Sequence, residues 1–163
     1  MTKHARLAEI EDLYRARFPH FKRVAMAIVG DPERAAEAVH DGFADAIRSR
    51  ARFRREGPLE AWVWRAVVNA ALRARSGPPE LELHESYFGQ NGHEECDPLA
   101  LRAAIAQLSD RQRLMLFLRY YADLDYRGIA IALDVRTGTV SATLHAAHAA
   151  LRRVLEEVPD ARH

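Results

Sequence analysis

The stretch from Asp123 to Arg153, DLDYRGIAIALDVRTGTVSATLHAAHAALRR, contains the pattern that decides the fold. Its apolar residues mark one face of a short helix and then, at spacings of four, three and four, one face of a longer helix. Asp134 stands between them, where the turn usually needs a left-handed backbone that Asp tolerates. Such a pair is a helix-turn-helix, which presents its second helix to the major groove of DNA. The apolar positions are Leu124, Ile129, Ala130 and Leu133, then Val140, Leu144, Ala147 and Leu151.

The composition limits the class of protein. With 163 residues, 48% of them hydrophobic, the chain can form one ordinary domain or two small ones with packed cores. No apolar run is long enough for a membrane span, and the N-terminus lacks the features of a signal peptide. A single cysteine, Cys96, excludes an internal disulfide framework. We therefore expect a cytoplasmic protein.

The net charge of +1 conceals three segments of different charge. Residues 1–75 carry a net charge of +5, residues 76–97 carry −6 without any Lys or Arg, and residues 98–163 carry +2. The middle segment contains Gly, Pro, Glu, His and Asn without hydrophobic periodicity, which predicts a flexible acidic linker. The sequence therefore predicts two small domains joined by that linker.

Hydrophobic periodicity and boundary residues predict an all-α protein. Pro19 interrupts the first helical segment, which is therefore one kinked helix or two short helices. Asp31 and Pro32 begin a second helix that runs to about Phe53, and Gly57-Pro58 begins a third. In the second domain, Ser109 is a plausible cap. The helices expected there span about 99–107, 110–121, 125–133 and 137–156.

Two series of short motifs occur in order along the chain. The first series is LYR at 13–15, IVGD at 28–31, AVHDGF at 38–43 and WVWR at 62–65. The second series is LSDRQR at 108–113, LDYRGIA at 124–130 and GTV at 138–140. Their order and spacing resemble sigma factors of bacterial RNA polymerase, specifically the extracytoplasmic-function group of the sigma-70 family, over nearly the whole chain. The resemblance implies a region 2 domain (1–75), a linker (76–97) and a region 4 domain (98–163), and a protein that is not an enzyme.

The resemblance also implies roles for particular residues. In the family, the second helix of region 2 docks on the clamp helices of core RNA polymerase; Glu37, His40 and Asp41 lie at the matching positions. The implied partners are core RNA polymerase, promoter DNA and an anti-sigma factor, with no membrane, cofactor, metal ion or small-molecule substrate. The segment from Phe53 through the third helix binds the minus-ten element and traps flipped bases. Its matching residues are Arg54, Trp62, Arg65, Asn69 and Arg73.

The side chains of this segment suit melted DNA, which needs stacking surfaces and cations. Trp62 lies on an apolar stripe, so it either stacks on DNA or is simply a core residue; Trp64 is the more exposed of the pair on the helical wheel. In the family the linker enters the active-centre cleft of the polymerase. The acidic linker of this chain is either a mimic of nucleic-acid phosphates in that cleft or a solvated spacer. Five arginines form either a DNA-binding cluster or a solvated helix end: Arg48, Arg50, Arg52, Arg54 and Arg55.

The second helix of the helix-turn-helix, which we call the reading helix, departs from the family pattern. Family members carry a Lys and several arginines on this helix. Here it reads VSATLHAAH at 140–148, and cations remain only near its two ends. Thr137 or Thr139 must then cap the helix, and Asp134 replaces the usual turn glycine. The residues that match the minus-thirty-five reading positions are Arg136, Thr137, Thr139, Ser141, Thr143, His145, His148 and Arg152.

Two interpretations of this helix remain. Its hydroxyl and imidazole groups can bond to bases or phosphates, so recognition rests on few charges and on DNA shape. Alternatively, the protein is a sigma-like adaptor that binds a regulatory protein without initiating transcription. A stand-alone helix-turn-helix repressor is a third hypothesis, although a repressor would not need the first domain. His93 and Cys96 provide too few ligands for a structural zinc site.

Overall fold

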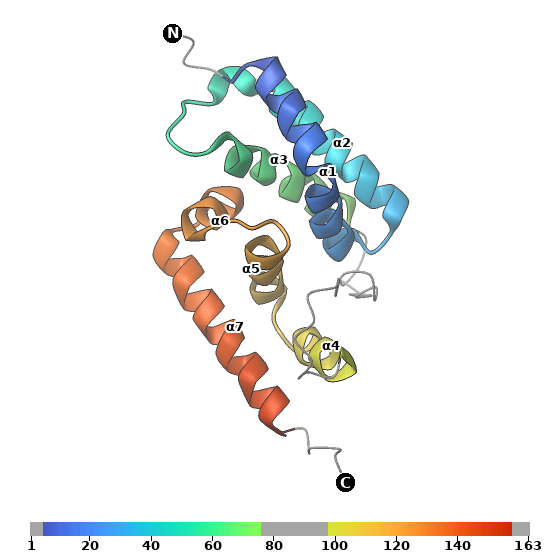
Figure 1. Cartoon of the computed structure of the whole chain (residues 1–163), viewed down its shortest axis with the longest axis vertical. Coiled ribbons are helices and arrows are strands. Elements are labelled where there is room, and N and C mark those ends of the chain that lie inside the picture. The colour runs from blue at the N-terminus through green and yellow to red at the C-terminus, as the bar shows by residue number, and fades with distance from the viewer. Residues whose placement is uncertain (1–4, 76–97, 158–163) are drawn as a thin grey trace.

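The described part of the chain folds into seven α-helices and one short 3-10 helix (Figure 1). The computed structural model describes residues 5–75 and 98–157. These residues contain no strand, and the predicted all-α fold class is confirmed. None of the described helices is long and apolar enough to cross a membrane. The elements are α1 (Leu7–Val29), α2 (Pro32–Arg48), η1 (Arg50–Arg52), α3 (Leu59–Ala74), α4 (Pro98–Ala106), α5 (Asp110–Tyr120), α6 (Tyr126–Leu133) and α7 (Thr137–Glu157).

Helices α1, α2 and α3 enclose an aromatic core in the upper half of Figure 1. Phe21 of α1 stacks on Trp64 of α3, with 4.0 Å between the ring centroids, and meets Phe43 of α2 edge to face at 5.0 Å. At Gly42, α2 comes so close to α3 that a Cβ would lie 2.5 Å from the Cα of Val67. The absence of a side chain at Gly42 therefore sets the distance between these two helices.

The start of α2 agrees with the prediction, and its end does not. Asp31 caps α2 by accepting from two backbone amides, with Pro32 in the first helical position, as predicted. Helix α1 runs through Pro19 as one helix. Helix α2 ends at Arg48, so the predicted end at about Phe53 is wrong. The chain tightens into η1 instead, because Phe53 leaves the helix in an extended conformation and becomes buried in the core.

Helices α4, α5, α6 and α7 pack together and continue the same hydrophobic core. The sequence predicts two of their boundary residues, Ser109 and Asp134. Ser109 and Gln112 form a reciprocal capping box at the start of α5. Asp125 caps α6 by accepting from the Gly128 amide at 2.7 Å. Asp134 adopts the left-handed conformation between α6 and α7, with φ 54° and ψ 50°, as predicted. These residues fix the helix-turn-helix.

Helix α7 begins one residue after Arg136, which corrects one prediction. Arg136, and not Thr137 or Thr139, precedes the first helical residue, and its carbonyl accepts from the amides of Thr139 and Val140. The threonines lie inside the first turn, so neither can cap the helix from that position. The buried face of α7 is as predicted, with Val140, Leu144 and Ala147 fully buried and Leu151 packed at the edge of the core.

The two helical groups pack against each other. Helix α6 lies along α3, and α5 approaches α1 (Figure 1). Arg17 of α1 links both groups, because it pairs with Glu60 at 2.9 Å and donates to the carbonyl of Ala122 at 2.7 Å. The predicted linker, with His93 and Cys96, lies outside the described residues.

Candidate nucleic-acid interface

The three residues predicted to bind polymerase lie together on the exposed side of α2. Glu37, His40 and Asp41 all face away from the core that α2 shares with α1 and α3. The His40 Nε2 is 2.9 Å from the Tyr14 hydroxyl, and its ring stacks on Phe18 with 6.0 Å between centroids. This α2 surface is therefore partly aromatic and is built by two helices. Its aromatic half was missed, because the apolar periodicity of α1 assigns Tyr14 to the core.

The residues predicted for the minus-ten element follow the outer side of α3 and the loop before it. Arg54 and Trp62 line a cavity of about 360 Å³, which we call the loop cavity. Arg65, further along α3, pairs with Asp134 at 3.2 Å. Asn69 is exposed, and Arg73 pairs with the Asp45 carboxylate of α2 at 2.9 Å. The structure therefore brings two of the five residues into one cavity and engages two others in ion pairs.

The relative exposure of the two tryptophans of α3 is the reverse of the prediction. Trp64 is fully buried against Phe21, so the prediction that it is the more exposed of the pair is wrong. Trp62 is partly buried and packs against Phe53, with 5.4 Å between ring centroids, at the margin of the core. Because Trp62 also lines the loop cavity, its position is compatible with stacking on a base.

The five arginines between positions 48 and 55 divide into two groups. Arg48 pairs with Asp45, which is the main cause of the lowered pKa of that carboxyl, and Arg50 donates to the Ile47 carbonyl. Arg55 pairs with Glu9 at 2.8 Å. In the described ranges, no hydrogen bond or ion pair engages the side chain of Arg52 or Arg54, and both residues line the loop cavity. The members of this second group are the cations that remain available for phosphate.

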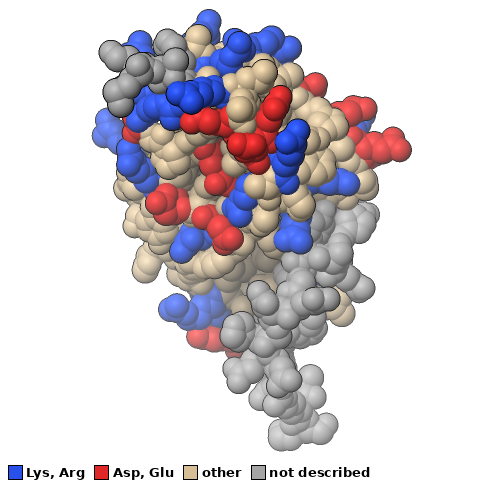
Figure 2. Space-filling model, turned by 45° about the horizontal axis from the view of Figure 1, so that its top comes forward, with Lys and Arg blue, Asp and Glu red and all other residues tan. Residues whose placement is uncertain are grey.

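The surface around these residues is not uniformly basic. Figure 2 shows Lys and Arg side chains close to Asp and Glu side chains over the face that comes forward. Glu9 is one of the acidic residues, and its pKa is lowered by the backbone amide of Arg6 and by Arg55. Attraction to DNA over long distances therefore reflects the net charge of +5 for residues 1–75 and not their total of 15 Lys and Arg side chains.

The reading helix α7 presents its predicted residues in two rows. Thr139 and Thr143 are partly buried and form one row, about half a turn around the helix from the other row. The exposed positions between the rows are small: Gly138, Ala142 and Ala146. The middle of the exposed face therefore offers methyl groups and backbone rather than cations. The other row, at spacings of three and four residues, is Thr137, Ser141, His145, His148 and Arg152.

One member of this row is held from outside the helix. The Nε2 of His148 is 2.9 Å from the hydroxyl of Tyr120 at the end of α5, and the two rings meet edge to face with 6.0 Å between their centroids. Tyr120 remains exposed and was not among the predicted residues. The cations near α7, Arg136 before it and Arg152 and Arg153 toward its end, are exposed. These guanidinium groups lie near the two ends of the helix.

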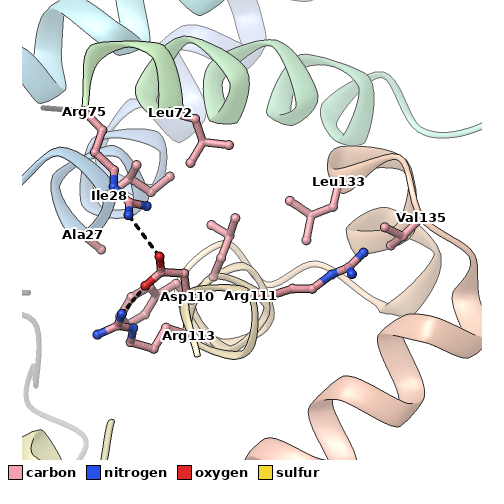
Figure 3. Close-up of a pocket in the computed structure, with 11 residues that line it drawn as sticks. Ala27, Ile28, Leu72, Arg75, Asp110, Arg111, Arg113, Leu133 and Val135 are labelled. Carbon is pink, nitrogen blue, oxygen red and sulfur yellow. Dashed lines mark hydrogen bonds and ion pairs between the residues drawn. The ribbon is translucent and has the colours of Figure 1, made fainter. Parts of the chain in front are cut away.

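A second cavity, of about 210 Å³, lies between the two helical groups (Figure 3). Its walls are mainly apolar and include Leu72 of α3 and Leu133 of α6. At its rim, Asp110 pairs with Arg75 at 3.0 Å and also with Arg113, and the Arg75 hydrogen bond is the main cause of the lowered pKa of Asp110. Within residues 5–75 and 98–157, no group of three His, Cys, Asp or Glu side chains is placed to hold a metal ion.

Two family models match the chain, one on each helical group. The model of sigma-70 region 2 matches residues 13–77, and the model of sigma-70 region 4 matches residues 99–151. The chain is similar to the RNA polymerase sigma-E factor of Streptomyces avermitilis, with 28% identity covering 94% of this chain and 88% of that protein. It is also similar to the ECF RNA polymerase sigma factor SigM of Mycobacterium tuberculosis, with 27% identity covering 89% of this chain and 76% of that protein.

Solved structures show the same fold. The sigma factor RpoE of Bartonella quintana, in complex with the anti-sigma factor NepR, superposes with a TM-score of 0.69 at 18% identity, over 93% of this chain and 99% of that chain. CnrH in complex with the cytosolic domain of CnrY gives a TM-score of 0.67 at 15% identity, over 93% and 90% of the two chains. With both regions matched in order along one chain, this protein belongs to the sigma-70 family of RNA polymerase sigma factors, in its extracytoplasmic-function group.

Proposed function

We propose that this protein binds core RNA polymerase, directs it to promoters and helps to open the promoter DNA. The observation that carries this proposal is the presence of both sigma-70 regions, in order, on one chain. The protein acts by binding and not by catalysis of its own, and it works in the cytoplasm, where a bacterium keeps its polymerase and chromosome. We assign region 2 to residues 1–75, the linker to 76–97 and region 4 to 98–163.

The α2 surface is the proposed contact with polymerase. Glu37 and Asp41 supply exposed carboxylates, and His40 supplies a ring that is held in place by Tyr14 and Phe18. A preorganised aromatic group between two charges is typical of the residues that dominate binding energy at protein interfaces.

The loop cavity is the proposed site for a base of the melted minus-ten element. Trp62 provides a face for stacking, while Arg52 and Arg54 provide cations for the adjacent phosphates. Arg65, Asn69 and Arg73 extend this surface along α3, provided that DNA replaces the ion pairs of the two arginines.

The exposed face of α7 is the proposed minus-thirty-five reader. The row from Thr137 to Arg152 can donate and accept hydrogen bonds at base edges, and the cations near both ends can bind phosphates. The low number of cations is the one observation that favours the second candidate function, an adaptor that binds a regulatory protein without initiating transcription.

The test is run-off transcription with purified protein, core polymerase and genomic promoter fragments, followed by sequencing of the transcripts. Specific start sites that share two upstream motifs support the proposal. Core binding without transcripts favours the adaptor, and DNA binding without any affinity for core favours a repressor. Asp41→Arg should weaken core binding, whereas Glu156→Arg makes the same charge change at an exposed position on α7 and should not. Equal core affinity of the two variants would remove the α2 surface from the proposal.

A further inference from the structure

The reading helix α7 exposes a narrow range of chemical groups. From Thr137 to Leu151 it contains no Arg, Lys, Asn, Gln, Asp or Glu. Its exposed side chains in that stretch offer two hydroxyl groups, one imidazole ring and two methyl groups, beside one glycine. Whatever base sequence α7 distinguishes must be distinguished by these groups. The exposed residues are Thr137, Gly138, Ser141, Ala142, His145 and Ala146.

The side chains that α7 lacks are those that identify a base by its pattern of hydrogen-bonding groups. In the major groove, Arg or Lys binds the O6 and N7 atoms of guanine, Asn or Gln binds N6 and N7 of adenine, and Asp or Glu accepts from N4 of cytosine. A hydroxyl group such as that of Ser141 can bond to a base, but it both donates and accepts and therefore does not choose among bases. The hydrogen bonds of α7 can orient the helix without selecting guanine.

The two histidines add little discrimination of this kind. The Nε2 of His148 is 2.9 Å from the Tyr120 hydroxyl, so one of its two ring nitrogens is already engaged. In the described part of the chain, no hydrogen bond or ion pair engages the exposed side chain of His145. Its two ring nitrogens point in different directions, and one donates while the other accepts in the neutral ring. His145 therefore offers a base a single hydrogen bond and not a matched pair.

Methyl groups are the remaining means of discrimination. Ala142 and Ala146 lie four residues apart, so both methyl groups are on the same side of α7. Four residues advance the helix by about 6 Å, and two base-pair steps advance along DNA by about 7 Å. Thymine is the base that carries a methyl group in the major groove, and alanine makes apolar contact with that group. The spacing of the two alanines therefore matches thymines about two base pairs apart.

The exposed face of α7 also permits the close approach that such contacts need. Gly138 lies one turn before Ala142 on the same side of the helix, and a Cβ there would meet nothing within 4 Å. Packing within the described residues therefore does not require a glycine at this position. One use of glycine is to let a backbone come close to a ligand. With a glycine and two alanines on this side, α7 can lie deeper in a groove than a helix with long cationic side chains.

We propose that this protein reads a minus-thirty-five element that contains thymines about two base pairs apart, through the methyl groups of Ala142 and Ala146, and that α7 does not select guanine there. The inference rests on the proposed function, which assigns α7 to that element. The contact buries methyl groups and neutralises no phosphate. It therefore contributes base preference without adding to the salt dependence of binding.

The first test is selection from a library of duplex DNA with a randomised segment. The full-length protein is used both in complex with core RNA polymerase and alone. We expect enrichment of thymines about two base pairs apart. Enrichment of guanine, or no enrichment by either form, would overturn the proposal. Enrichment of the thymine pattern by the protein alone, with no affinity for core, would support the base preference and count against the proposed function.

The second test removes the methyl group from the DNA and leaves the hydrogen-bonding groups of the base in place. Uracil in place of either selected thymine should weaken binding about fourfold, because one buried methyl contact is lost. Ala142→Gly and Ala146→Gly should each abolish the effect of one of the two uracil replacements. Ala103→Gly is the matched control at an exposed position of α4, and it should keep both effects. Equal affinity of the wild type for thymine and uracil DNA, or equal uracil effects in all the proteins, would overturn the proposal.

Discussion

The close approach of α2 and α3 at Gly42 allows a prediction with a definite sign. Gly42→Ala adds a methyl group 2.5 Å from the Cα and 2.8 Å from the amide nitrogen of Val67. Both are backbone atoms, so no rotamer change relieves the clash, and the helices must move apart. Overpacking of this kind costs about 3 kcal/mol. The replacement of glycine inside a helix offsets about 1 kcal/mol of that.

We therefore expect Gly42→Ala to lower the free energy of unfolding by about 2 kcal/mol, which corresponds to a fall of about 4–8 °C in Tm. The assay is urea and thermal unfolding followed by circular dichroism. Gly138→Ala is the matched control, because a Cβ there meets nothing within 4 Å and should leave stability unchanged or raise it by up to about 1 kcal/mol. A Gly42→Ala protein as stable as the wild type would refute the reasoning, since it would mean that α2 and α3 have room for a methyl group.

Three further predictions follow from the site. Trp62→Ala should abolish promoter opening in a run-off assay with little loss of stability, whereas Trp64→Ala should lower the free energy of unfolding by about 3–5 kcal/mol; the opposite pattern would contradict the assignment. Burial, with Arg17 and Arg23 nearby, lowers the pKa of His20, so the folded state binds fewer protons than the unfolded state. Stability should therefore fall as the pH drops below about 6.5, and less so in His20→Asn, as measured by urea unfolding. Ser141→Lys should raise the affinity for promoter DNA in complex with core and steepen the salt dependence by about one unit, and an unchanged slope in a salt titration would exclude Ser141 from the phosphate contacts.

Local chemistry explains why much of the fold could be predicted from the sequence. Asp31 and Ser109 cap their helices as expected, because the side chain of a capping residue bonds to amides only two or three positions away. Asp134 takes the left-handed conformation for a reason that is equally local. The apolar face of α7 was predictable because it packs on a single core.

Several predictions that failed depend on contacts between different elements of the fold. The apolar periodicity of α3 allows either of two adjacent helix faces to point into the core. Only the stack of Trp64 on Phe21 of α1 decides which of the two is buried. The early end of α2 follows from the burial of Phe53 against Trp62. Likewise, the role of Tyr14 beside His40 depends on two helices that meet only in the folded chain. No local pattern records such pairings.

The sequence assigns a set of residues to the candidate site, but their arrangement depends on the fold. The family motifs identify α2, α3 and α7, while the pairing of Arg65 with Asp134 joins residues from the two different regions. The two rows on α7 could have been separated by a helical wheel, because Thr139 and Thr143 lie about half a turn from Ser141.

Asp134 serves two requirements that a single glycine could not meet. The left-handed turn alone favours glycine, which adopts that conformation without the strain of roughly 1 kcal/mol that an Asp carries there. Only Asp, however, supplies the carboxylate that reaches Arg65. Asp134→Gly would therefore separate the two properties, with a more relaxed turn and no ion pair to Arg65. The residue that bends the chain before α7 therefore also ties the helix-turn-helix to α3, and any substitution at position 134 changes both properties.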